Sequence, residues 1–344
     1  MKASKTSLYP PQPSVPVRTW MRLGSLCGCL LLPVWSAPAL AADISSRPLA
    51  GMEKALLDGR ADAAAAGLQP ILSANPSNGF AHLLLCRVWL SEGLATQAVE
   101  ECQAALANGL ERDSTAQDWT GRALGAQAQH AGLLKGMKLA FGVRNAFEAA
   151  VNLNPTSEAA CVDLGEYYTS APAIVGGGSE KALALAARIQ NSLPAVAHRI
   201  RAMNAEKEKD FSTAEQEFRD EVAASRNPGT LVDLAAFYGR RHQDGMAIAA
   251  ARETLAADRE HDATVVEAAG VLGDAHQGQL AAAAMRDYLA HGDRSDIAPA
   301  FRVHTMLGTF LASSGEKDAA RAQYEQALAL ASHYAPAQKG LGAL

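Results

Sequence analysis

Residues 301–330 read FRVHTMLGTFLASSGEKDAARAQYEQALAL, and this stretch decides the fold class. Apolar residues recur every three to four positions on both sides of the polar turn SSGEK, as expected of two amphipathic helices. Gly308 in the first segment and Ala320 in the second are small, and small residues let two antiparallel helices approach closely. The stretch therefore predicts a helical hairpin.

The same pattern recurs along most of the chain. A Gly or polar turn is followed by a few polar residues and then by an alanine that opens an apolar helix. These alanines are Ala64, Ala98, Ala214, Ala247 and Ala320, and the first two are 34 residues apart. A proline closes three of the copies, at Pro76, Pro155 and Pro194. A fixed period of this length indicates a stacked repeat.

This pattern resembles the tetratricopeptide repeat (TPR), and the resemblance covers about residues 45–334. It implies an all-α, right-handed superhelical solenoid of about eight helix pairs over residues 42–344. In such a solenoid no pair buries its apolar face alone, so successive copies stack into one core. The resemblance also implies a non-enzymatic role in protein–protein interaction or scaffolding, with a protein or peptide partner of unknown identity.

The N-terminal residues 1–41 are expected to be a signal peptide. An apolar stretch at residues 23–35 precedes Ala39-Leu40-Ala41, which fits the small-x-small rule for cleavage. Met21 is an alternative start. Lipidation at the LCGC of residues 26–29 is a less favoured alternative, because the apolar run continues after it. We expect a periplasmic or secreted protein of the bacterial cell envelope, with no transmembrane segment after signal cleavage.

Composition and motifs exclude several classes of function. A net charge of −5 and a pI near 6.0 argue against nucleic acid as a partner, because phosphate binding needs a basic excess. The GGGSEKA of residues 176–182 lacks the Gly-Lys-Ser order of a phosphate-binding loop and follows a helix. Neither a metal-binding spacing nor a catalytic triad is found, so we expect no enzyme, metal or cofactor. The recurring His82, His198 and His304 indicate helix packing.

The first helix of each copy is expected to line a concave groove. Charged residues placed in this groove by their repeat position are Arg87, Glu166, Arg199, Arg240 and Arg302. One hypothesis is a protein-binding scaffold. The alternative is an accessory protein that holds a small ligand, a peptide or a cell-wall fragment in the groove.

Two enlarged inter-helix loops are expected, near residues 131–142 and 170–178. They carry the apolar side chains Leu133, Leu134, Met137, Ile174 and Val175. Exposed apolar clusters usually mark an interface. The alternative is that the two loops pack on each other and on the superhelix.

The mature chain keeps Cys86, Cys102 and Cys161, so at most one internal disulfide can form. Cys86 and Cys102 are expected on facing helices of one copy. A disulfide between them is one interpretation, and two buried free thiols are the other.

Overall fold

The computed structural model describes residues 49–260, 262–291 and 295–344, and they are mostly helical. A first helix spans residues 49–57. It is followed by α2 (Ala61–Ala74), α3 (Gly79–Ser91), α4 (Ala95–Ala105), η1 (Leu106–Leu110), α5 (Ser114–Gln129), α6 (Leu133–Leu153), α7 (Glu158–Ser170), η2 (Ala173–Val175), α8 (Ser179–Ile189), α9 (Pro194–Lys207), α10 (Phe211–Ala224), α11 (Pro228–Arg240), α12 (Asp244–Ala257), α13 (Ala263–Asp274), α14 (Gly278–His291), α15 (Ala300–Ser313), α16 (Lys317–Leu330) and α17 (Ala335–Gly342). The expected signal peptide, residues 1–41, lies outside the described residues.

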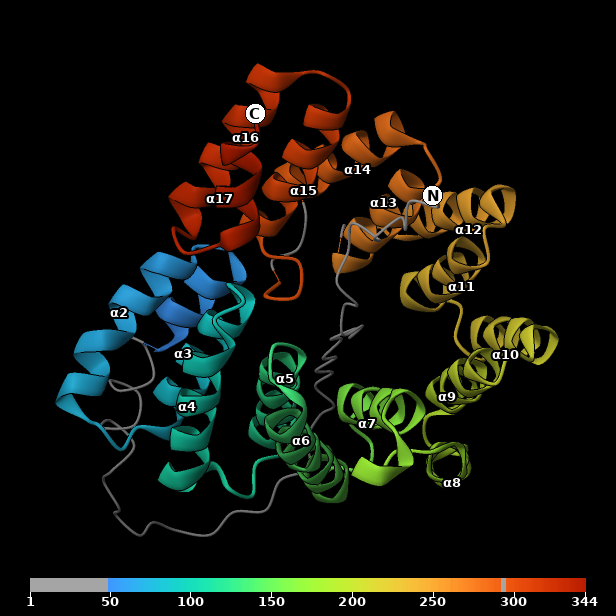
Figure 1. Cartoon of the computed structure of the whole chain (residues 1–344), viewed down its shortest axis with the longest axis horizontal. Coiled ribbons are helices and arrows are strands. Elements are labelled where there is room, and N and C mark those ends of the chain that lie inside the picture. The colour runs from blue at the N-terminus through green and yellow to red at the C-terminus, as the bar shows by residue number, and fades with distance from the viewer. Residues whose placement is uncertain (1–48, 261, 292–294) are drawn as a thin grey trace, which may run out of the picture.

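Within the part of the chain that the structure describes, the helices form eight successive antiparallel pairs, from the helix at residues 49–57 with α2 to α15 with α16 (Figure 1). Helix α17 packs on the last pair. The expected all-α solenoid of about eight helix pairs is therefore confirmed.

One turn conformation is repeated in six of the pairs. The residue five positions before the buried alanine of the second helix has a positive φ in each of them. These residues are Gly59 (72°), Gly93 (82°), Lys209 (64°), His242 (55°), His276 (61°) and Gly315 (82°). The left-handed conformation ends the first helix and turns the chain back.

Small residues fill the contact points between the two helices of a pair and between neighbouring pairs. Ala64, Ala98 and Ala320 are completely buried. A Cβ on Gly165 would lie 2.5 Å from Cγ1 of Ile200, and one on Gly308 would lie 2.9 Å from Cε1 of Tyr324. The Leu-Gly positions are therefore sites where a neighbouring side chain occupies the space of a Cβ.

The three recurring histidines each join the two helices of one pair. The Nδ1 atom of His82 lies 2.6 Å from Glu101, that of His198 lies 2.7 Å from Glu217, and that of His304 lies 2.8 Å from Gln323. Each partner is 19 residues further along the chain. This geometry gives the recurrence a structural explanation.

The loop predicted at residues 131–142 is not a loop. Helix α6 begins at Leu133 and runs for 21 residues, so the extra residues lengthen the helix. The stretch contains no proline, and its leucines, lysines and methionine are good helix formers. Leu133 and Leu134 lie on the first turn of α6 with 81% and 83% of their surface exposed.

The second enlarged connection, residues 171–178, is a loop that contains the short helix η2. Its interior is held by Tyr167, whose hydroxyl lies 2.9 Å from the carbonyl oxygen of Ala140 in α6 and 2.8 Å from that of Val175. Val175 is 4% exposed, whereas Ile174 is 71% exposed. The prediction that both side chains are presented to a partner is therefore wrong for Val175, which this loop buries.

The two ends of the solenoid meet, so the pairs form a closed ring (Figure 1). Leu56, Leu68 and Val88, from the first pairs, belong to the same buried apolar cluster as Phe301 and Ala331 from the last pair. A second cluster runs from α3 to α9 on the other side of the ring. The backbone N–H of Ser332 donates to Asp62 at 2.9 Å, across 270 residues of sequence.

Candidate functional site

A groove of about 2220 Å³ lies along the inner face of the ring. It is lined mainly by the first helices of five successive pairs, α7, α9, α11, α13 and α15, with smaller contributions from α10, α12 and α14. Apolar side chains of Met203, Val266, Met306 and Phe310 line it together with charged groups. The repeat positions these side chains, because the corresponding face of each first helix points to the inside of the ring.

A row of charged residues crosses this groove, one from each of the five helices. The row consists of Glu166, Arg199, Asp233, Glu267 and Arg302, at intervals of 33 to 35 residues. The three acidic members outnumber the two arginines. The middle of the groove is therefore richer in carboxylates than in cations.

Three of the four arginines that line the groove are held by acceptors of the protein itself, whereas the exposed Arg252 has no partner among the described residues. Arg199 is buried and donates to Asp233 on α11, the first helix of the next pair. Arg240 donates to both carboxylate oxygens of Glu206, at 2.9 and 2.8 Å. Arg302 donates to the carbonyl oxygen of Ile297 at 2.7 Å. Each of these three guanidinium groups is therefore bonded to the protein itself and is not directed only into the groove.

Glu166 and Glu267 differ from the arginines in this respect. Both are half-buried in the groove wall, and neither carboxylate accepts a hydrogen bond from the described residues. Burial raises the pKa of Glu166 to about 7, although Arg199 opposes the shift. Burial, with Asp233 nearby, also raises the pKa of Glu267 to about 7. Such shifted carboxyls in a cleft are typical of a binding site.

A buried ionic cluster lies next to the groove, between α5 and α7. Arg122 donates to Asp163 at 2.5 Å and contacts Asp118 at 2.8 Å. Its guanidinium also stacks 4.6 Å from the centre of the Trp119 ring. Burial raises the pKa of Asp118 to about 8. Sequence reasoning missed this cluster, because its residues look like an ordinary polar helix face.

The structure brings four of the five predicted groove residues to the groove: Glu166, Arg199, Arg240 and Arg302. Arg87 is the exception. It contacts Glu53 at 3.0 Å and Asp296 at 2.8 Å, and so lies where the ends of the ring meet. The repeat position alone could not show this, because it contains no information on ring closure. Asp233 was missed, although its place in the row follows from the same spacing.

Cys86 and Cys102 form a disulfide that joins α3 to α4 within one pair, with their Cα atoms 5.2 Å apart. The structure therefore contains the disulfide and not two buried free thiols. Cys161 is a buried free thiol, and burial raises its pKa to about 11. A thiol with so high a pKa is unreactive at neutral pH.

Comparison with known proteins identifies the fold. No family model matches the sequence, and no curated protein matches it. Yeast Tom70, by its solved structure, aligns with a TM-score of 0.50 and 14% identity over 82% of this chain and 58% of its own. The chain has the TPR fold. Two further similar structures are a thermophilic TPR protein of Thermus thermophilus (TM-score 0.45, 20% identity, 66% of this chain and 98% of that one) and a TPR protein of Parabacteroides merdae (TM-score 0.42, 12% identity, 87% and 98%).

A helix that spans a membrane needs about 20 predominantly apolar residues. Within residues 49–260, 262–291 and 295–344, no helix is both long and apolar enough to cross a bilayer.

Proposed function

We propose that this TPR solenoid is a non-enzymatic binding module that holds a segment of a partner protein in its groove. The observation that carries the proposal is the groove itself, a continuous hollow of about 2220 Å³ that spans five helices. Its length along the ring suits an extended chain segment better than a compact metabolite.

The groove favours a partner segment with basic and apolar side chains. Glu166 and Glu267 offer carboxylates that no described residue bonds. Met203, Val266 and Phe310 offer apolar contact area close to them. A Lys or Arg side chain of the partner would pair with the carboxylates and hold them in their charged form.

The alternative occupant is a small ligand or a cell-wall fragment. An anionic fragment would need arginines that converge on it. Arg199 and Arg240 are instead bonded to Asp233 and Glu206. The peptide hypothesis therefore has the better support.

A second contact surface is proposed at the edge of the ring. Leu133, Leu134 and Ile174 are large apolar side chains with more than two thirds of their surface exposed. Met137, which follows Leu133 and Leu134 in sequence, is half-buried. Apolar groups exposed in this way are typical of an interface.

We propose that the protein acts in the bacterial cell envelope, either in the periplasm or after secretion. Two observations support this proposal: the signal-like sequence of residues 1–41, and the Cys86–Cys102 disulfide, because disulfides persist mainly in oxidising compartments. Fractionation of cells that express the untagged full-length chain tests it. Recovery of a protein shortened by about 41 residues in the periplasmic fraction supports export, whereas a full-length cytoplasmic protein contradicts it.

Site-specific photo-crosslinking tests the binding groove. A photoreactive residue replaces Met203 in the groove or, as the matched control, Gln216 on the exposed face of α10. We expect a partner adduct from position 203 that weakens when Glu166 and Glu267 are both changed to Gln. Equal adducts from positions 203 and 216 would show that the groove is not the binding site.

A further inference from the structure

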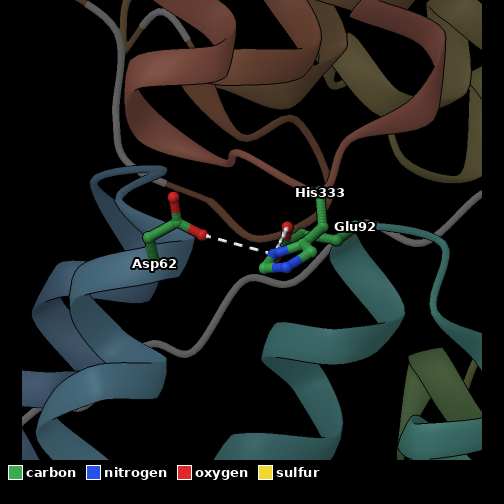
Figure 2. Close-up of side chains that lie close together, drawn as sticks. All are labelled: Asp62, Glu92 and His333. Atoms are coloured by element: carbon green, nitrogen blue, oxygen red, sulfur yellow. Dashed lines mark ion pairs between the residues drawn. The ribbon is translucent and has the colours of Figure 1, made fainter. Parts of the chain in front are cut away.

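Three potential metal ligands meet where the ends of the ring join (Figure 2). Asp62 lies on the first turn of α2, and Glu92 follows the last residue of α3. His333 comes from the turn between α16 and α17, more than 200 residues away in sequence. Ring closure is therefore what creates this cluster.

The three side chains point toward one another in Figure 2. Nδ1 of His333 lies 3.8 Å from Oδ1 of Asp62 and 3.8 Å from Oε2 of Glu92. With one ligand atom taken from each residue, the three atoms lie within 4.8 Å of one another. Ligands of a tetrahedral zinc ion, with bonds of about 2.1 Å, are roughly 3.4 Å apart, so small side-chain movements would suffice.

Glu92 provides a second, independent observation that points to a bound ion in this cluster. Its side chain is fully buried, with 0% of its surface exposed, and no well-formed hydrogen bond from the described residues reaches either carboxylate oxygen; the backbone N–H of His333 makes only a long or poorly aligned contact with it. A buried carboxylate without partners is costly, and buried charges are normally paired or coordinate a metal.

Two further polar contacts reach the cluster, and an ion bound at Nδ1 of His333 would have to displace the one from the Ser332 hydroxyl. Oδ2 of Asp62 accepts the backbone N–H of Ser332 at 2.9 Å, which leaves Oδ1 directed at His333. The Ser332 hydroxyl lies 3.3 Å from Nδ1 of His333. The His333 side chain is 64% exposed, so an ion can enter from solvent and can keep a water ligand.

We propose that Asp62, Glu92 and His333 bind one divalent transition-metal ion of the zinc class, which clamps the ring shut. One imidazole nitrogen and two carboxylates form a donor set that suits Zn²⁺, and a site with three protein ligands leaves a position for water. Mg²⁺ and Ca²⁺ prefer oxygen ligands alone, so the imidazole disfavours them.

A second cluster of similar composition, His198 with Glu217 and Asp220, does not share these features. Nδ1 of His198 is already bonded to Glu217 at 2.7 Å. The same contact recurs at His82 with Glu101, so it serves the helix pair. Of these two clusters, the one at the ring closure combines ligands from both ends of the chain with an unbonded buried carboxylate.

The clamp would couple metal binding to the shape of the molecule. Asp62 and Glu92 belong to the first two pairs, whereas His333 belongs to the last. An ion bound to all three binds only the closed ring, so it stabilises closure by mass action. Removal of the ion would favour separation of the ends.

Zinc titration of the untagged, EDTA-treated protein tests the proposal by calorimetry and by metal analysis after dialysis. We expect one tight Zn²⁺ per chain, and no comparable binding of Mg²⁺ or Ca²⁺. His333→Ala and Glu92→Gln should each weaken this site by about tenfold or more. The control His130→Ala removes an exposed histidine far from the cluster in sequence and should bind as the parent does.

Thermal unfolding provides the second readout. Zn²⁺ should raise the unfolding temperature of the parent and of His130→Ala, but not of His333→Ala. His333 is exposed, so its variant should fold even if Glu92→Gln does not. Absence of tight zinc binding in the parent, or equal binding by the parent and His333→Ala, would overturn the proposal.

Discussion

At the residue scale, substitutions at the turn position with positive φ allow backbone strain to be measured apart from side-chain packing. Lys209 is exposed and has a φ of 64°, in the region where residues other than glycine are strained. We expect Lys209→Gly to raise the free energy of unfolding by about 1 kcal/mol, because glycine has no Cβ penalty there. Urea unfolding measures the change.

Gly315 provides the reverse control for this prediction. It has a φ of 82°, and a Cβ there would meet no atom within 4 Å, so only the backbone is affected. Gly315→Lys should lower the free energy of unfolding by about the same 1 kcal/mol. If both substitutions destabilise the protein, the turn position does not act through φ.

Glu166 and Glu267 make stability depend on pH. Each has a folded-state pKa raised by burial from 4.5 to about 7, so the folded protein binds protons more tightly than the unfolded chain. This contribution to stability is fully present below pH 4.5 and is lost as the pH rises through about 7. The unfolding temperature should therefore fall between pH 5.5 and pH 8.

The double variant Glu166→Gln, Glu267→Gln is the comparison for the pH effect. Neutral amides cannot titrate, so its unfolding temperature should change less over this range. Other buried carboxyls, Glu92 and Asp118 among them, also have a raised pKa and leave a residual slope. An identical slope in the parent and the double variant would show that these two groups do not titrate as described.

Much of the groove could be predicted at this scale, and the rest could not for a physical reason. Glu166, Arg199, Arg240 and Arg302 follow from the repeat, because a helix face has a fixed position within each copy. Which carboxylates stay unbonded depends on side chains of the neighbouring pair. That information is tertiary, and the period of the sequence does not contain it.

At the element scale, α6 shows how a repeat can absorb extra residues. The repeat predicts where an insertion occurs but not whether it becomes a loop or extends a helix. Both insertions contain three glycines, but the one before residue 179 also contains Pro172 and is a loop. The insertion before residue 143 lacks proline and is helical.

The extended turns of α6 should contribute little to stability. Leu134 is 83% exposed, whereas Val143, further along the same helix, is 5% exposed. We expect Leu134→Asp to change the free energy of unfolding by less than about 0.5 kcal/mol, and Val143→Asp to lower it by several kcal/mol. Urea unfolding distinguishes them. If Leu134→Asp is as destabilising as Val143→Asp, the first turn of α6 is packed rather than exposed.

At the scale of the whole molecule, the closed ring is the feature that could not be predicted from the sequence. Contacts between the ends, such as Ser332 with Asp62, join residues 270 positions apart. These contacts do not alter the periodic pattern of the sequence, because each end makes them with a surface that every repeat has. Arg87 was placed in the groove for this reason, although its partners Glu53 and Asp296 hold it at the junction.

Two glycines with the same turn role allow closure to be tested apart from backbone strain. Gly59 and Gly93 have φ values of 72° and 82°, so alanine is strained by a similar amount at each. A Cβ at Gly59 would lie 2.4 Å from the backbone nitrogen of Ala300, whereas a Cβ at Gly93 meets nothing within 4 Å. Gly59→Ala should therefore separate the ends and increase the radius of gyration in small-angle X-ray scattering. Gly93→Ala should keep the parent's radius and lose only about 1 kcal/mol of stability. If the two variants scatter alike, the ring is not closed through Gly59 in solution, since the steric conflict with Ala300 is the only difference between them that depends on the junction.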